Sequence, residues 1–185
     1  MKALLRYVKL GVIVAISGIY ATPAFADTQF PQELSKMVMP SEGGSLPEDL
    51  AFVDENGNEV AFNSLKGQVV LVNLWATWCP TCRAEMEVFE QAQQAYPHVR
   101  FVMLNQGESK AEVAAFIEAE GYQFDNLWLD MEGRMGHWFG QSALPVTLVF
   151  NKEGKLLNGR MGAMSAATLE QLLTQGSGLS LPTHF

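Results

Sequence analysis

Residues 69–82 read VVLVNLWATWCPTC, and they decide the fold of this chain. An apolar, β-branched run of strand length leads through two tryptophans to the chain's two cysteines, Cys79 and Cys82, at the head of a helical pattern. A thiolate at such a strand-to-helix turn faces free N–H groups and the positive end of the helix dipole, which lowers its pKa. The spacing therefore predicts a redox dithiol in which Cys79 attacks and Cys82, one turn further along, resolves the mixed disulfide.

Other uses of the cysteine pair are less well supported. A structural disulfide across so small a loop would restrain little chain entropy. A closed zinc site needs about four ligands, whereas this chain has one cysteine pair and scattered histidines. Soft side chains could in principle collect copper, although methionine more often fills gaps in a core. The histidines are His98, His137 and His184, and the copper candidates are Met131, Met135, Met161, Met164 and His137. No resident metal or other cofactor is therefore expected.

Residues 1–26 have the pattern of a secretory signal peptide. They combine three basic residues, an apolar stretch of roughly a dozen residues and the small-x-small pattern Ala24-Phe25-Ala26. The apolar stretch is shorter than the ~20 residues that a spanning helix needs, so an uncleaved membrane anchor is the weaker alternative. Residues 27–47 are rich in proline and glycine and indicate a leader or linker. We therefore expect the mature protein in the periplasm.

The charge of the mature chain excludes some partners. Removal of the signal peptide leaves nine Lys and Arg against 20 Asp and Glu, a formal charge of −11. So acidic a protein is not expected to bind nucleic acid or an anionic membrane surface. The 159 residues that remain suit one domain with a core of its own, without disulfide stapling.

Strand and helix patterns alternate along the rest of the chain. A β-hairpin with its turn at Asn56-Gly57 precedes the central strand, and a capping box at Ser109 opens a later helix. Two strands joined by the short turn 151–154 must be antiparallel. These patterns predict an α/β domain over residues 48–176, with a mixed central sheet and helices on both faces, followed by a frayed tail at 177–185. The predicted strands are 50–53, 59–62, 69–75, 99–104, 126–129, 146–150 and 155–161, and the predicted helices end near Tyr96, Gly121, Phe139 and Gln175.

Residues 75–85, WATWCPTCRAE, carry a resemblance to a known family, together with the hairpin before them and LPVT at 144–147. The chain resembles the thioredoxin fold and, more narrowly, the exported TlpA, ResA and DsbE (CcmG) branch of thioredoxin-like thiol-disulfide oxidoreductases. The resemblance covers about residues 48–175, nearly the whole expected domain. It implies a thioredoxin fold with an extra N-terminal β-hairpin, and a Cys79–Cys82 disulfide as the redox group.

The resemblance also implies roles for individual residues. Cys79 matches the exposed nucleophile, and Cys82 matches the more buried resolving thiol. Pro145 matches the cis-proline that packs opposite the disulfide and leaves the backbone of Leu144 free to pair with an extended substrate. Glu85 matches an acid that helps to move protons to and from the dithiol.

The side chains around the cysteines are expected to meet the substrate. Trp78, Pro80 and Thr81 are the candidates, with Trp78 offering a flat apolar surface. Trp75 lies within the strand and is expected in the core.

One position departs from the thioredoxins proper, which keep a buried aspartate six residues before the first cysteine. This chain has Asn73 there, so a buried-carboxylate role is expected to fall to Glu85, with Glu108 as the outside candidate. Many relatives also have a proline soon after the acid at Glu85. This chain has none there, so its first helix is expected to be straighter.

Together these features predict an exported thiol-disulfide oxidoreductase that works mainly as a reductant of substrate protein disulfides. Acidic neighbours such as Glu85 and Glu87 oppose thiolate formation, which favours a reducing potential. The resemblance implies a DsbD-like or CcdA-like membrane electron donor, and substrates with disulfides or cysteine pairs in cytochrome c maturation or oxidase assembly. The dipeptide Pro80-Thr81 resembles the cytochrome-maturation members. Two alternatives stay open: an oxidant that introduces disulfides, and a copper- or apoprotein-binding chaperone that uses the dithiol as ligands.

Overall fold

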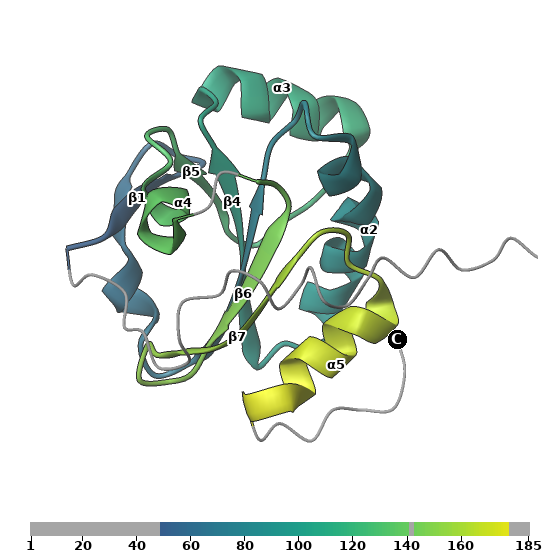
Figure 1. The fold of residues 1–185 in the computed structure, drawn as a ribbon. Coiled ribbons are helices and arrows are strands. Elements are labelled where there is room, and N and C mark those ends of the chain that lie inside the picture. The colour runs from purple at the N-terminus through teal and green to yellow at the C-terminus, as the bar shows by residue number, and fades with distance from the viewer. Residues whose placement is uncertain (1–48, 141–142, 178–185) are drawn as a thin grey trace, which may run out of the picture. The chain divides into compact units, whose positions relative to one another are not determined.

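The computed structural model describes residues 49–140 and 143–177 (Figure 1). The predicted signal peptide, the leader and all but the first residue of the predicted tail lie outside these ranges. Within the described ranges, no helix is long and apolar enough to cross a membrane.

One seven-stranded sheet organises the described residues (Figure 1). Its strands are β1 (Ala51–Asp54), β2 (Glu59–Ala61), β3 (Val69–Trp75), β4 (Val99–Gln106), β5 (Leu127–Asp130), β6 (Val146–Phe150) and β7 (Leu156–Met161). They lie in the order β2-β1-β5-β4-β3-β6-β7. Strands β3, β4 and β5 run parallel, whereas β1 is antiparallel to β2 and β5, and β6 is antiparallel to β3 and β7. The predicted mixed sheet is confirmed.

Helices cover both faces of this sheet, as predicted. They are the 3-10 helix η1 (Phe62–Leu65) and the α-helices α2 (Pro80–Ala95), α3 (Lys110–Glu120), α4 (Arg134–Phe139) and α5 (Ala166–Ser177). Buried side chains of α2, α3 and α5 share one core, and those of η1 and α4 belong to the other core. Figure 1 shows α4 on the opposite side of the strands from α2.

Strand β3 is buried along its whole length, and its side chains alternate between the two cores. Leu71 and Trp75 pack in the core beneath α2, and Val72 and Leu74 pack in the opposite one. The same alternation directs Asn73 toward α2, where its side chain has no exposed surface. Burial of an amide is unfavourable without hydrogen bonds. The partners of Asn73 therefore matter for what this part of the molecule does.

Some predicted boundaries differ from the structure. Strand β4 runs to Gln106, past its predicted end at Leu104, because its last residues pair in register with β5. Strand β2 ends at Ala61, since the next residue opens η1. The predicted start of the frayed tail at Ser177 is wrong, because α5 continues to Ser177. A glycine within a helix costs only about 1 kcal/mol, which does not suffice to end it.

Candidate active site

The two cysteines lie where β3 passes into α2, and they form a disulfide. Cys79 is the N-cap of α2, and its Sγ accepts a hydrogen bond from the backbone N–H of Cys82 at 3.2 Å. Pro80 follows in the first turn, where its missing N–H leaves no bond unmade. Cys79 is 5 % exposed and Cys82 is fully buried. A partner therefore reaches Cys79 first, and the helix end stabilises negative charge on that sulfur after reduction.

Exposed side chains surround the nearly buried disulfide. Trp78 is 67 % exposed, and Pro80 and Thr81 are also exposed. Trp75 is instead buried against Phe116, with ring centroids 5.7 Å apart, so the prediction of a core residue is confirmed. The exposed indole of Trp78 is thus an apolar surface next to the reactive cysteine.

Leu144 and Pro145 lie at the same edge of the sheet as the disulfide. The peptide bond between them is cis, as predicted, and the Pro145 carbonyl accepts a hydrogen bond from the N–H of Gly162 at 3.0 Å. Strand β6 begins at the next residue, Val146, which pairs with Leu74 of β3. This antiparallel register brings Leu144 beside the residues that follow β3, and Leu144 packs against the core that contains both cysteines.

Glu85 lies one helical turn after Cys82 and is only 1 % exposed. Its Oε1 accepts a hydrogen bond from Nδ2 of Asn73 at 2.9 Å, and its Oε2 accepts one from the backbone N–H of Met164 at 2.7 Å. The same Nδ2 also donates to Oγ1 of Thr147 at 3.1 Å. The asparagine at the position of the thioredoxin aspartate therefore orients a carboxylate that comes from the helix.

Burial raises the pKa of Glu85 from 4.5 to about 7. Loss of surrounding water is the largest cause, and the two hydrogen bonds and the positive charge of Arg160 lower the pKa only in part. Arg160 pairs with Thr147, and Thr147 pairs with Asn73, so these three residues form one row across β7, β6 and β3 beneath α2. A carboxyl group with this pKa exchanges a proton readily near neutral pH.

A second buried carboxylate, Glu108, holds the loop before Cys79. Its Oε2 accepts hydrogen bonds from the N–H of Thr77 and from Nδ2 of Asn105, both at 2.7 Å, and its Oε1 accepts the Thr77 hydroxyl. The contact forms because β3 and β4 are parallel neighbours, so the residues after each strand meet at one edge. Glu108 was the second candidate for the buried acid, after Glu85. It accepts hydrogen bonds from Thr77 and Asn105, and the sequence alone indicates a role for neither of these two residues.

Residues 34–173 of the chain match the family model described as Redoxin. This match spans far more than half of the sequence. The chain belongs to the Redoxin family. Among its Redoxin relatives, the thiol-disulfide oxidoreductase ResA of Bacillus subtilis (strain 168) is 32% identical over 138 residues, which cover 72% of this chain and 74% of ResA. The thioredoxin-like protein YneN of the same strain is 27% identical over 146 residues, which cover 77% of this chain and 85% of YneN.

Solved structures agree with this assignment to the Redoxin family. A Chlorobium tepidum protein described as a thiol:disulfide interchange protein DsbE is 25% identical, with a TM-score of 0.64 over 72% of this chain and 95% of that protein. StoA of Bacillus subtilis is 25% identical, with a TM-score of 0.57 over 68% of this chain and 98% of StoA. The predicted thioredoxin fold and the resemblance to thiol-disulfide oxidoreductases of the ResA and DsbE kind are thereby confirmed.

In this Redoxin site, replacement of Glu108 with alanine is expected to lower the free energy of unfolding by about 2–4 kcal/mol. The change removes the acceptor of Thr77 and Asn105, and each buried donor left unpaired costs about 1–3 kcal/mol. Chemical denaturation measures the loss. Glu112→Ala is the matched control, because Glu112 is an exposed acid that closes a capping box with Ser109, as predicted, and its loss is expected to cost less than that of a buried acceptor. Equal losses of unfolding free energy in the two variants would contradict the prediction that Glu108 is the acceptor of buried hydrogen-bond donors.

The methionines that were candidates for copper do not all lie on one face of the sheet: Met161 packs against the core that contains Met135, and Met164 belongs to the other core. Met135 is buried in the core beside α4, whereas Met164 is buried in the core beneath α2, on the other face of the sheet. Met131 is 56 % exposed. Over residues 49–140 and 143–177, no group of three or more His, Cys, Asp or Glu side chains is arranged to hold a metal ion.

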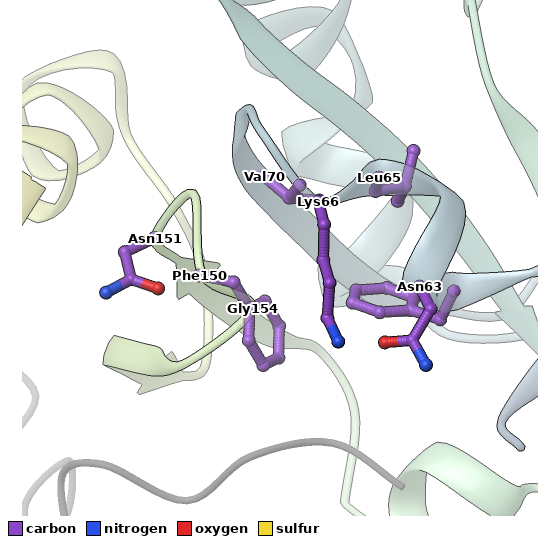
Figure 2. Close-up of a pocket in the computed structure, with 8 residues that line it drawn as sticks. Asn63, Leu65, Lys66, Val70, Phe150, Asn151 and Gly154 are labelled. Carbon is purple, nitrogen blue, oxygen red and sulfur yellow. The ribbon is translucent and has the colours of Figure 1, made fainter. Parts of the chain in front are cut away.

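A small pocket lies at the start of β3, at the end opposite to the disulfide (Figure 2). Figure 2 shows the Lys66 side chain extending between η1 and the turn after β6, with Phe150 beside it. The pocket volume is about 10 Å³, room for about one water molecule. It is therefore too small to bind a substrate.

Proposed function

We propose that this Redoxin-family chain is an exported thiol-disulfide oxidoreductase that works mainly as a reductant of protein disulfides. The observation that carries the proposal is the buried Glu85 carboxyl group one turn behind Cys82, with its pKa raised to about 7. Thiol-disulfide exchange near neutral pH needs a group that accepts and returns the protons of the thiols. The name of the Bacillus subtilis relative ResA, a thiol-disulfide oxidoreductase, supports the same reaction class.

The proposed reaction starts from the reduced enzyme. The Cys79 thiolate attacks one sulfur of a substrate disulfide, and the other substrate sulfur leaves as a thiolate. Cys82 then gives its proton to the Glu85 carboxylate, and the Cys82 thiolate attacks Sγ of Cys79. The Cys79–Cys82 bond forms as the bond between Cys79 and the substrate breaks. Two electrons pass to the substrate, whose two thiolates take up one proton from Glu85 and one from water.

Substrate contacts are proposed on both sides of the reactive sulfur. Trp78, Pro80 and Thr81 present exposed surface beside Cys79. The backbone of Leu144, just before the cis peptide bond, would pair with an extended substrate segment. Main-chain pairing of this kind accepts many sequences, because it leaves substrate side chains to be chosen by neighbouring surfaces.

The proposed direction of electron flow rests on the charge near the thiols. A strong oxidant stabilises its reduced form through a low thiol pKa, and a nearby carboxylate opposes thiolate formation. Glu85 acts in this way when it is ionised. Glu87 is exposed and accepts a hydrogen bond from Gln91, so water and salt screen its charge. We therefore attribute the reducing tendency to Glu85 alone.

The proposed compartment determines the proposed partners. After removal of residues 1–26 the protein would work in the periplasm, which is kept oxidising. A reductant there needs electrons from the other side of the membrane, and a DsbD-like or CcdA-like membrane protein is the proposed donor. The proposed substrates are proteins with disulfides or cysteine pairs in cytochrome c maturation or oxidase assembly.

The reduction potential of the dithiol tests this proposal. We expect a value nearer to that of thioredoxin, about −270 mV, than to that of DsbA, about −120 mV. The measurement equilibrates the purified exported protein with graded dithiothreitol or glutathione buffers at pH 7.5 and counts free thiols. Glu85→Gln should shift the potential toward oxidising values, because it removes the charge that opposes the thiolate. A wild-type reduction potential near that of DsbA would overturn the proposal that the protein is a reductant. It would favour the alternative, an oxidant that introduces disulfides.

A further inference from the structure

A groove lies between α3, the loop that follows α3 and the turn between β1 and β2. Its lining includes Ile117, Tyr122, Phe124 and Leu127, and it contains none of the residues of the dithiol site. Its volume is about 670 Å³, within the ~300–1,000 Å³ typical of binding clefts. The redox reaction does not use this groove.

The floor of the groove is aromatic and continues into the core. The rings of Tyr122 and Phe124 stack with centroids 5.8 Å apart, and Phe116 lies 6.5 Å from Tyr122. Phe116 in turn contacts Trp75 of β3. Tyr122 and Phe124 are only partly buried, so part of each ring is open to a ligand. The faces of aromatic rings carry partial negative charge and attract cations.

Helix α2 holds this floor in place. Nε2 of Gln93 donates to the carbonyl of Gln123 at 2.6 Å, and Oε1 of Gln93 accepts the N–H of Asp125 at 3.0 Å. The Glu90 carboxylate accepts the N–H of Gln123 at 2.7 Å. A loop that is already fixed by three hydrogen bonds loses little conformational entropy on binding, which favours its use as a docking surface.

The charged residues that line the groove are acidic, whereas Arg83 lies on Phe116 and Lys110 lies beside Gly57 in the turn between β1 and β2. Glu55, Glu118 and Asp125 are exposed and line it, and the described lining residues include no lysine or arginine. Burial raises the pKa of Tyr122 most, Glu120, Glu87 and Glu90 outside the groove raise it further, and Arg83 lowers it. The three carboxylates of the lining attract a positively charged partner.

One arginine of the chain already binds to this aromatic cluster. The Arg83 guanidinium lies 5.3 Å from the centroid of Phe116, and it pairs with the Glu120 carboxylate at 2.8 Å. Stacking on a ring and pairing with a carboxylate are the two contacts that guanidinium groups prefer. Tyr122, the ring next to Phe116, is partly exposed and lines the same groove as Glu118.

We propose that this groove docks a basic segment of a partner protein, with an arginine or lysine side chain over Tyr122 and Phe124 and its charge paired with Glu118 or Asp125. Charge complementarity selects this occupant, because the described lining combines aromatic rings with three carboxylates and contains no lysine or arginine. A partner bound here would stay attached to the molecule while its cysteines react, which raises their effective concentration. The docking site goes beyond the proposed redox reaction and does not depend on its direction.

The test measures how a short synthetic peptide of alternating arginine and leucine binds to the purified exported protein. An NMR titration at low salt should shift backbone amide signals of residues 117–127. The double variant Glu118→Lys/Asp125→Lys should raise Kd by about tenfold, about 1.4 kcal/mol. The matched control Asp49→Lys/Glu153→Lys changes the net charge equally at two exposed acids outside the groove. It should raise Kd by less than about twofold, since distant exposed charges are screened.

Other outcomes overturn the proposal. If both double variants weakened peptide binding equally, or if the shifted amide signals were spread over other surfaces, the peptide would be attracted only by the net charge of the protein. Absence of peptide binding at millimolar concentration would contradict docking outright. Shifts of the same amides on concentrating the protein without peptide would make a second copy the occupant. The Cys79→Ser protein should bind the peptide as the wild type does, so a failure of docking and a failure of the redox proposal are distinguishable.

Discussion

Replacing Cys79 with serine is expected to abolish the reduction of protein disulfides, with a loss on the order of a thousandfold or more. Cys79 is the sulfur at the helix end and has exposed surface, whereas Cys82 has none. A serine hydroxyl cannot form the mixed disulfide through which the exchange proceeds. The measurement follows reduction of insulin by the purified protein without residues 1–26, with dithiothreitol to regenerate the dithiol.

The Cys82→Ser variant is the matched control, since it also removes one sulfur from the same turn. It should react once and stop at a mixed disulfide through Cys79, seen as a covalent adduct in non-reducing electrophoresis. A variant that traps no protein, together with stoichiometric copper binding by the wild type, would favour the chaperone alternative over the reductase.

The second large effect is a pH dependence of stability through Glu85. Folding raises its pKa from 4.5 to about 7, so between these pH values the folded protein binds more protons than the unfolded chain. The contribution of Glu85 to the free energy of unfolding is therefore expected to fall as the pH rises from 4.5 to 7. The total fall is about 3 kcal/mol, and it is complete about one pH unit above the folded pKa. Chemical denaturation gives the free energy of unfolding of the wild type and of Glu85→Gln at each pH in this range. The difference between these two values, plotted against pH, isolates the contribution of Glu85.

A variant whose unfolding free energy should depend on pH in the opposite direction controls for this result. Hydrogen bonds from Ser109 lower the pKa of the exposed Glu112, so its stabilisation is present at neutral pH and is lost as the pH falls. Glu112→Gln should therefore give a difference curve that slopes the other way. A flat curve for Glu85→Gln would contradict a raised pKa. In the reduced protein above pH 7, Glu85→Gln should also lower the pKa of Cys79, measured by thiolate absorbance, and an unchanged value would remove Glu85 from the redox site.

Strand β3 and the dithiol could be predicted because they depend on local patterns. An unbroken apolar run indicates a buried strand, and a Cys-x-x-Cys at the start of a helix indicates a redox site. Glu85 is different, because its helical position alone is compatible with an ordinary surface acid. Its burial depends on Asn73 and Met164, which lie 12 and 79 residues away. Only the family resemblance pointed to this carboxylate.

Contacts between segments that are far apart in the sequence could not be predicted from local patterns. Glu108 and Thr77 are 31 residues apart, and no periodic pattern in either segment indicates that they meet. The groove beside Tyr122 is formed in the same way, by side chains of α2 that fix a loop about 30 residues further along the chain. The end of α5 was misplaced for another reason, since small free energies decide where a helix stops.

The hydrogen bond from Met164 to Glu85 has a consequence for the protein before it has folded. If the chain is exported as proposed, it crosses the membrane with its N-terminus first, so the cysteines emerge before Met164, which follows Glu85 by 79 residues. Until then Glu85 lacks this donor and the cover of β6 and β7, and it remains an ordinary solvated acid. The nascent cysteines are then a plain thiol pair, open to the oxidants of the compartment. An exported molecule would then be oxidised before it has folded, and the proposed electron donor would have to reduce it once before its first turnover.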